Sequence, residues 1–229
     1  MNQVILVIPA YNEEQNIKRV VDNLIRNYPE LDYVVVNDGS TDSTERILRE
    51  NGYNHITLPV NLGLAGCFQT GMKYACERGY SYAVQFDGDG QHRAEYVAGM
   101  RRKMDEGYSI VIGSRFVEGK KDFSPRMLGS RLIGLAIWLT TGARVSDPTS
   151  GMRMFDRRMM EKFAYQMNYG PEPDTVSLLI HQGAKVAEVP VVIDERTGGE
   201  SYLKPAVAAK YMFRMLVSIL VIQNFRGRG

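Results

Sequence analysis

The sequence predicts an α/β domain with a mostly parallel central sheet, and three observations support this fold class. Short apolar runs alternate with segments in which apolar residues recur with helical period. The first run, Val4 to Ile8, opens the chain and is followed by a helical pattern. With 44% hydrophobic and 24% charged residues among 229, the composition is globular, and one domain of ordinary size can bury a sizeable core.

The predicted strands are short apolar runs bounded by polar or turn-forming residues. After the first strand, the runs lead us to expect strands at residues 33–36, 56–58, 82–86, 110–112 and 186–193. The rhythm of strand and helix is regular up to residue 89 and looser beyond it. No internal repeat or low-complexity linker marks a clean domain boundary.

The predicted helices lie between these strands. Between Ile17 and Tyr28 the apolar residues follow i, i+3, i+4, i+7 spacing, and Asn12 is the expected cap of that helix. Gly52 and Gly79 stand where two later helices should end. Further helices are expected at residues 42–50, 64–77, 95–106, 131–141 and 173–182.

The C-terminal stretch, residues 204–229, differs from the domain expected over residues 1–203. It is mostly apolar, and from Ala206 onward it carries four basic residues and no acidic one. Its uncharged part, Met215 to Ile222, is far shorter than the roughly 20 residues that cross a bilayer. We expect an amphipathic helix on an anionic membrane surface or on a small membrane-protein partner, with an ordinary packed terminal helix as the alternative.

Cysteine content and charge indicate the compartment and the partners. Cys67 and Cys76 lie nine residues apart in one predicted helix and match neither a disulfide framework nor a metal-binding spacing. The N-terminus lacks the features of a signal peptide. We therefore expect a cytoplasmic protein at the inner face of the cell membrane. Before Ala206, 24 basic residues face 26 acidic ones, which argues against nucleic acid as a partner. A homo-oligomer is also compatible with the sequence.

Polar residues follow three predicted strands where each ends, at residues 9–14, 37–40 and 87–92. Ligands of parallel α/β sheets bind beyond the carboxyl ends of the strands, so these segments form the candidate site. Carboxylates gathered on one edge would repel one another unless a cation or hydrogen-bond donors were present.

The Asp87-Gly88-Asp89 motif is the candidate metal site. Two carboxylates and the Gln91 carbonyl are hard oxygen donors, suited to Mg²⁺ or Mn²⁺ shared with phosphate oxygens. A tight turn in which Asp87 caps a neighbouring loop is the structural alternative. His92 could likewise touch donor or metal, or make a structural hydrogen bond.

Taken together, these motifs resemble family 2 glycosyltransferases with the GT-A fold, a Rossmann-like nucleotide-sugar-binding fold. The polyprenol- or dolichol-phosphate sugar synthases and small bacterial polysaccharide enzymes are the most similar subgroup. The resemblance covers nearly the whole chain through residues 7–14, 36–42, 86–92, 113–115, 147–153 and 188–201.

The resemblance implies roles for individual residues. The nucleotide's base and ribose would be lined by Pro9, Tyr11, Glu13, Val36 and Asp38. The metal and pyrophosphate would be held by Asp87, Asp89 and Gln91, with Gly88 between the aspartates. The donor diphosphate or an acceptor phosphate would face Arg115, Arg131 and Arg196. One departure is Tyr202, which stands where the synthases have a phosphate-binding lysine; Lys204 follows two residues later.

The implied reaction is inverting transfer of a sugar from a UDP-, GDP- or dTDP-sugar to a polyprenyl phosphate or a lipid-linked glycan. A divalent cation would offset charge on the leaving nucleoside diphosphate. A phosphate acceptor needs no base, whereas a hydroxyl does, and Asp147 and Glu172 are the first candidates. Turn formation is the alternative for Asp147, and capping of the next helix is the preferred reading of Asp174.

Three other protein classes are weighed against this one. A sugar nucleotidyltransferase would carry a Gly-rich loop with Arg after the first strand, where this chain has Pro9-Ala10-Tyr11-Asn12. A dinucleotide-binding dehydrogenase would need Gly-x-Gly-x-x-Gly at the same place. A degenerate transferase serving as a non-enzymatic scaffold is disfavoured by the intact acidic motifs.

Overall fold

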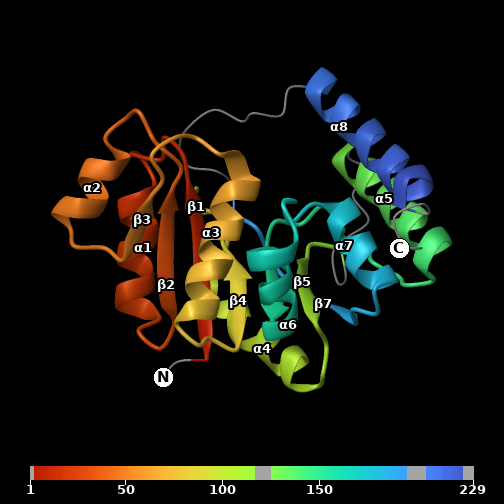
Figure 1. Cartoon of the computed structure of the whole chain (residues 1–229), viewed down its shortest axis with the longest axis horizontal. Helices are drawn as coiled ribbons and strands as arrows, with labels where there is room; N and C mark the ends of the chain where they lie inside the picture. The colour runs from red at the N-terminus through yellow and green to blue at the C-terminus, as the bar shows by residue number, and fades with distance from the viewer. Residues whose placement is uncertain (1–2, 117–124, 195–204, 224–229) are drawn as a thin grey trace.

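A seven-stranded sheet forms the centre of the molecule (Figure 1). The computed structural model describes residues 3–116, 125–194 and 205–223. The strand order is β3-β2-β1-β4-β6-β5-β7, and every neighbouring pair is parallel except those that β6 makes with β4 and β5. The predicted mostly parallel sheet is thus confirmed. The strands are β1 (Val4–Ala10), β2 (Asp32–Asn37), β3 (His55–Thr57), β4 (Tyr82–Gln85), β5 (Ile110–Ser114), β6 (Arg153–Asp156) and β7 (Val186–Pro190).

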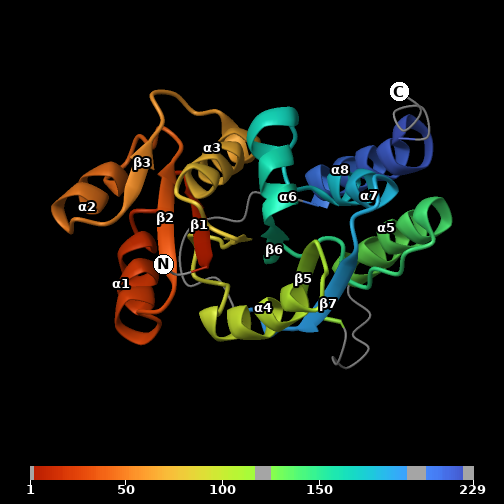
Figure 2. The ribbon, with the colours of Figure 1, turned by 60° about the horizontal axis from the view of Figure 1, so that its bottom comes forward.

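Helices contribute to a hydrophobic core on each face of the sheet (Figure 2). In β1, Ile5 and Val7 face one core while Leu6 and Ile8 face the other, which is why this strand is apolar at successive positions. The second core takes side chains from α1 (Ile17–Asn27), α2 (Thr44–Glu50) and α4 (Val97–Asp105). The first core takes them from α3 (Gly63–Glu77), α5 (Pro125–Thr141), α6 (Arg157–Glu161), α7 (Pro173–His181) and α8 (Pro205–Val217).

Strand β6 is the main element that the periodicity did not predict. It is only four residues long, and charged residues stand at both of its ends, so its sequence reads as loop. Its pairing is non-local: Arg153 lies opposite Gln85 of β4 and Ile112 of β5. Long-range pairing of this kind leaves no periodic signal in a short segment. The fold therefore places a buried arginine in the middle of the sheet.

The predicted cap of α1 is wrong. The residue that precedes α1 is Asn16, whose side chain makes no capping hydrogen bond. Asn12 lies in the loop after β1 with a left-handed backbone, φ 55°, which asparagine tolerates. Its Oδ1 accepts a hydrogen bond from the backbone N of Thr41 at 2.9 Å, and its own backbone N donates to Ser40 Oγ at 3.0 Å. Asn12 thus ties the loop after β1 to the loop after β2.

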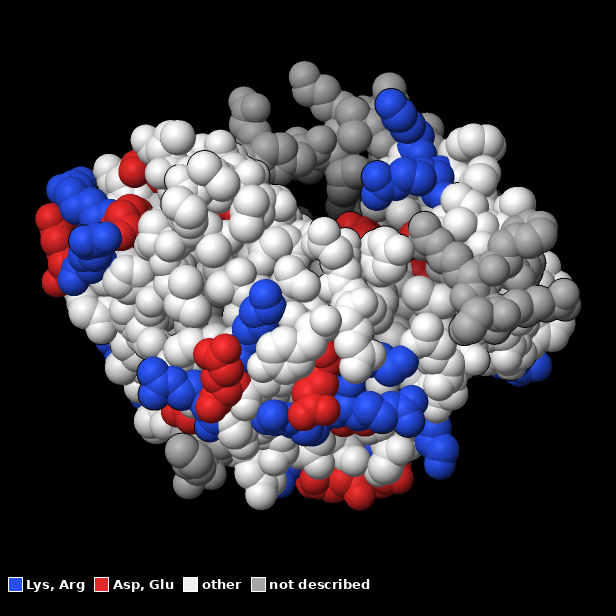
Figure 3. Space-filling view, viewed as in Figure 1, with Lys and Arg blue, Asp and Glu red and all other residues white. Residues whose placement is uncertain are grey.

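The C-terminal helix α8 packs on α5 and α7 of the same chain and continues as a π-helical turn over Ser218–Ile222. Met215 and Ile219 are buried in the first core. Lys and Arg side chains gather over α8 on the face shown in Figure 3, where Lys210 and Arg214 are exposed. Within the described ranges, no helix is both long and apolar enough to cross a bilayer.

Candidate active site

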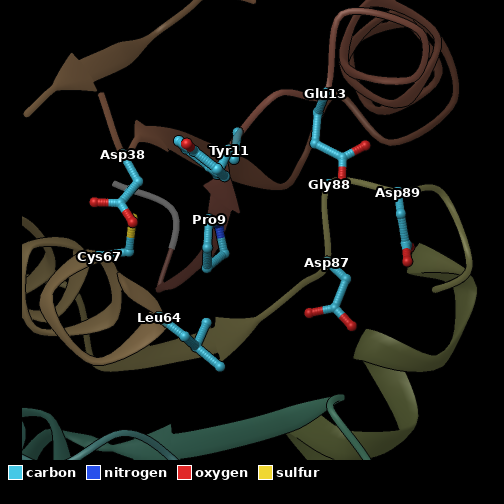
Figure 4. Close-up of a pocket in the computed structure, with 10 residues that line it drawn as sticks. Pro9, Tyr11, Glu13, Asp38, Leu64, Cys67, Asp87, Gly88 and Asp89 are labelled. Atoms are coloured by element: carbon cyan, nitrogen blue, oxygen red, sulfur yellow. The ribbon is translucent and has the colours of Figure 1, made fainter. Parts of the chain in front are cut away.

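A pocket of about 310 Å³ opens at the carboxyl edge of the sheet, within the size range of small-molecule sites (Figure 4). The loops after β1, β2 and β4 line it together with the first turns of α3. Its lining residues are Pro9, Ala10, Tyr11, Glu13, Asp38, Leu64, Cys67, Asp87, Gly88 and Asp89. Asp38 and Cys67 lie at one end of the pocket, and Asp87 and Asp89 lie at the other.

Seven of the predicted site residues meet in this pocket, because parallel strands end at the same edge. Val36 is fully buried in the core beneath, where its carbonyl oxygen accepts a hydrogen bond from the Cys67 thiol. Gln91, Arg115 and Arg131 lie outside the pocket lining. Arg196 lies outside the described residues, as do Tyr202 and Lys204.

Two pocket residues, Leu64 and Cys67, were not predicted. Both come from the N-terminal turns of α3, which carry none of the polar motifs that follow the strands. Burial and the neighbouring charge of Asp38 raise the pKa of the Cys67 thiol to about 12. The thiol therefore stays protonated at neutral pH and serves as an apolar wall of the pocket, not as a nucleophile.

Asp38 joins β2 to α3. Its Oδ1 accepts a hydrogen bond from the backbone N of Leu62 at 2.7 Å, and its Oδ2 accepts one from Gly63 at 2.8 Å. A carboxylate at this place satisfies backbone donors of the helix N-terminus and is stabilised by the helix dipole. The side chain is 3% exposed, so its position against the pocket is fixed.

Asp87 is oriented by its neighbours. The backbone N of Asp87 donates to His92 Nδ1 at 3.0 Å, so a neutral imidazole carries its proton on Nε2, which lies 3.5 Å from Asp87 Oδ2. His92 is 7% exposed and stacks edge-on against Phe86. A Cβ added to Gly151 would lie 2.9 Å from Asp87 Oδ2, so a larger residue there would displace the carboxylate from its observed position. Of the two roles considered for His92, the structural hydrogen bond is the one observed.

The backbone around Asp89 is tied to the segment after β7. Asp89 Oδ1 accepts a hydrogen bond from the backbone N of Gln91 at 3.0 Å. The Gln91 side chain turns to that segment, where Nε2 donates to the carbonyl of Asp194 at 3.0 Å. Asp194 in turn makes a 2.5 Å ion pair with Arg93, which holds the pKa of its carboxyl below the ordinary value. Metal ligation by Gln91 stays a prediction.

The chemistry of the pocket fits a divalent cation shared with a diphosphate. Four carboxylates line it, those of Glu13, Asp38, Asp87 and Asp89, and among the residues that the structure describes no Lys or Arg joins them in the lining. Among the described residues, no three acidic, histidine or cysteine side chains form a ready-made metal site. Mg²⁺ and similar ions commonly take one or two protein carboxylates and complete their shell with substrate phosphates and water. Asp87 and Asp89 are the two carboxylates expected to supply such a pair.

Asp147 is fully buried and engaged with Arg115. The Arg115 guanidinium binds both carboxylate oxygens, with Nε 2.6 Å from Oδ2 and Nη2 2.6 Å from Oδ1. The hydroxyls of Ser130 and Thr149 and the backbone N of Arg115 donate to the same carboxylate. Ser150 N closes the expected turn on the Asp147 carbonyl. This geometry favours an orienting role for Asp147, which holds Arg115, over proton abstraction.

Glu172 and Asp174 lie at the N-terminus of α7 and contact the C-terminal helix. Glu172 occupies the cap position, and its Oε2 accepts a hydrogen bond from the Tyr211 hydroxyl. Asp174 lies in the first turn, where Oδ2 accepts a hydrogen bond from Ser218 Oγ at 2.8 Å. The sequence motifs included neither Tyr211 nor Ser218, because such contacts arise only when α8 folds back onto α7.

A mostly parallel α/β sheet with an acid-rich pocket at the ends of β1, β2 and β4 defines the GT-A class of fold. The solved structure of glucosyl-3-phosphoglycerate synthase from Mycobacterium tuberculosis, in complex with Mn²⁺ and UDP-glucose, has the same fold. It matches 97% of this chain and 79% of its own, with a TM-score of 0.69 at 18% identity.

Residues 5–164 match the model of glycosyl transferase family 2, so the chain belongs to that family and is a glycosyltransferase. The polyprenol monophosphomannose synthase of Mycolicibacterium smegmatis is 28% identical over 93% of this chain and 85% of its own. The UDP-N-acetylglucosamine–dolichyl-phosphate N-acetylglucosaminyltransferase of Methanococcus voltae is 32% identical over 82% of this chain and 84% of its own. The undecaprenyl-phosphate mannosyltransferase of Micrococcus luteus is 28% identical over 91% of this chain and 90% of its own length.

Proposed function

We propose that the protein transfers a sugar from a nucleotide-sugar to a polyprenyl phosphate, with inversion at the anomeric carbon and a divalent cation as cofactor. The observation that carries the proposal is the pocket whose described lining holds four carboxylates, which suits a cation shared with a diphosphate. The named relatives, which cover most of this chain, act on polyprenyl or dolichyl phosphates. Metal use is supported by the Mn²⁺ and UDP-glucose bound in a protein of the same fold.

Residues at the two ends of the pocket would bind different parts of the donor. Pro9, Tyr11 and Asp38 would hold the base and ribose at one end, since Asp38 is anchored there by the N-terminus of α3. At the other end, Asp87 and Asp89 would hold the cation. When bound, the cation would offset the negative charge that develops on the departing diphosphate. His92 keeps the Asp87 carboxylate in place.

The acceptor determines whether a protein base takes part. A phosphate monoester has its second pKa near 6 and is a competent nucleophile at neutral pH without help. A lipid-linked glycan would offer a hydroxyl, which needs a carboxylate to take its proton. Glu172 is then the better placed of the two candidates, because the Asp147 carboxylate is buried and already bound by Arg115.

A donor and acceptor panel tests the proposal. UDP-, GDP- and dTDP-sugars are each incubated with undecaprenyl phosphate, dolichyl phosphate or a lipid-linked glycan, with Mn²⁺ or Mg²⁺ or with a chelator. We expect one donor to give a lipid-phosphate sugar, with rate lost in chelator, and NMR of the product to show the inverted anomer. Transfer only to the glycan would contradict the phosphate acceptor, and full activity in chelator would contradict the metal requirement. A product with the anomeric configuration of the donor would contradict inversion. Formation of a nucleotide-sugar from nucleoside triphosphate would favour the nucleotidyltransferase alternative.

We further propose that α5 and α8 contact an anionic bilayer. Four leucines of α5, spaced as one helical stripe, are 45–64% exposed: Leu128, Leu132, Leu135 and Leu139. On α8, Phe213 is 71% exposed, and Lys210 and Arg214 stand beside it in solvent. An exposed apolar stripe of this kind marks an interaction surface, and basic residues such as Lys210 and Arg214 suit anionic headgroups. A polyprenyl acceptor would also be presented at such a surface.

Substitution of the leucine stripe tests the bilayer contact. The double variant Leu135→Glu and Leu139→Glu should bind phosphatidylglycerol vesicles about tenfold more weakly than wild type in co-sedimentation, since two apolar contacts are replaced by repelled charges. Ile25→Glu is the matched control, because Ile25 is 48% exposed on α1. Equal vesicle binding by the double variant and the control would overturn the proposal.

A further inference from the structure

The C-terminal helix contributes a side chain that contacts Glu172, a candidate site residue. Tyr211 of α8 lies 39 residues from Glu172 in the chain, yet its hydroxyl donates a hydrogen bond to Glu172 Oε2. Burial and the adjacent carboxylate raise the pKa of the Tyr211 hydroxyl, so it remains a donor throughout the physiological range. The contact leaves the second oxygen of Glu172 without a hydrogen bond to any described residue.

A buried arginine lies behind this pair. Arg153 of β6 is 2% exposed, and its Nη2 donates to the Pro148 carbonyl at 2.7 Å, while Nε and Nη1 have no partner among the described residues. Burial lowers the pKa of Arg153, and the nearby Glu172 carboxylate is the foremost group that opposes this effect. A buried guanidinium that is not fully hydrogen-bonded is costly, so its retention beside Glu172 indicates a use for the positive charge.

Two observations place the segment that carries Glu172 near the pocket. A Cβ at Gly170 would lie 3.7 Å from both Ala65 Cβ and Glu172 Cγ, so the loop before α7 lies against the first turn of α3, where Leu64 lines the pocket. The charge of Arg153 also acts on Asp87 of the pocket. The charges of Glu172 and Asp87 thus both act on the same buried cation.

We infer that Tyr211 is a positioning residue that holds Glu172 so that its free oxygen accepts a hydrogen bond from a substrate hydroxyl. This inference rests on the proposed sugar transfer. The hydroxyl belongs to the transferred sugar or, where the acceptor is a lipid-linked glycan, to that acceptor; a carboxylate accepts a hydrogen bond from either one. The C-terminal helix is therefore part of the site, in addition to any membrane contact.

The test removes only the Tyr211 hydroxyl. In Tyr211→Phe, we expect kcat for sugar transfer to fall about tenfold or more, the scale of a lost hydrogen bond to a charged group, with unchanged affinity for the nucleoside diphosphate alone. Tyr165→Phe, at a side chain 58% exposed, is the matched control and should match wild type. Thermal denaturation of each variant verifies that the fold is kept.

A double-mutant cycle with Glu172→Gln separates positioning from packing. If Tyr211 acts through Glu172, the Tyr211→Phe effect on kcat disappears in the Glu172→Gln background. Calorimetry then identifies the hydroxyl: weaker binding of the intact sugar-nucleotide, with nucleoside diphosphate binding unchanged, points to the transferred sugar. A raised KM for the acceptor, with unchanged affinities for the sugar-nucleotide and for the nucleoside diphosphate, points to a hydroxyl of the acceptor.

Three results would overturn the inference. The first is a wild-type kcat in Tyr211→Phe, and the second is a loss of kcat from Tyr211→Phe that is equal in the wild-type and Glu172→Gln enzymes. The third is an equal loss of affinity for the nucleoside diphosphate and for the sugar-nucleotide in Tyr211→Phe. The first two arise with a wild-type enzyme that transfers sugar, so they leave the proposed function standing. If wild type transfers sugar from no donor, the proposed function fails, and calorimetry with the sugar-nucleotides still decides whether Tyr211 and Glu172 receive a hydroxyl of the sugar.

Discussion

Replacement of Asp89 by alanine should reduce sugar transfer by a factor on the order of 10²–10³ while leaving the fold intact. Asp89 supplies one of the two carboxylates that suit a cation, and with Asp87 alone the charge on the leaving diphosphate would be poorly offset. Its structural contribution is small, because the only hydrogen bond that its side chain accepts from a described residue is from the backbone N of Gln91. Loss of that bond costs about 1 kcal/mol.

Two measurements check this expectation. Steady-state transfer is measured over a range of Mn²⁺ concentrations, and Mn²⁺ binding in the presence of nucleoside diphosphate is measured by calorimetry. The matched control is Asp105→Ala, which removes a half-exposed carboxylate at the end of α4. Wild-type Mn²⁺ affinity in Asp89→Ala, or undiminished transfer by that variant in chelator, would exclude the metal role.

Replacement of Asp147 by alanine should lower the free energy of unfolding by about 3–5 kcal/mol, which is the cost of removing one partner of a buried ion pair. The Asp147 side chain is 0% exposed and that of Arg115 is 20% exposed, so solvent can compensate little of the charge left on Arg115. The donors from Ser130 and Thr149 would also lose their acceptor. For a chain of this length, we expect the melting temperature to fall by roughly 10 °C.

The control is Glu161→Ala, which removes the partner of Arg157 from an ion pair that is nearly half exposed on both sides. Such pairs contribute under about 1 kcal/mol. Denaturant unfolding of both variants gives the comparison. If Asp147 were instead the catalytic base, Asp147→Asn would keep wild-type stability and lose transfer to a hydroxyl acceptor. A stable, inactive Asp147→Asn would therefore reverse our assignment of the residue as the support of Arg115.

The acid-rich edge could be predicted because its signals are local. Strands β1, β2 and β4 are continuous apolar runs followed at once by polar motifs, and parallel strands must end together. A Cβ at Gly88 would lie 3.0 Å from the Pro9 carbonyl oxygen, so the glycine between the two aspartates allows the loop after β4 to close against β1. The class of protein thus followed from the order of motifs along the chain.

The other side of the site could not be predicted from local signals. Strand β6 is short and begins with a charged residue, and its place between β4 and β5 depends on pairing across long stretches of chain. Whether Asp147 is a base or the buried partner of Arg115 depends on which groups surround it, and a sequence pattern does not specify burial of a single carboxylate.

The sequence by itself determined the fold class, the strand ends and the Asp87-Gly88-Asp89 turn, since periodicity and motif spacing are properties of neighbouring residues. Only the tertiary structure decided that α8 packs back on α7, that Tyr211 meets Glu172, and that Arg153 is buried beside them. These contacts join segments tens of residues apart. Their energies come from burial and charge pairing in three dimensions, which leave no local pattern along the chain.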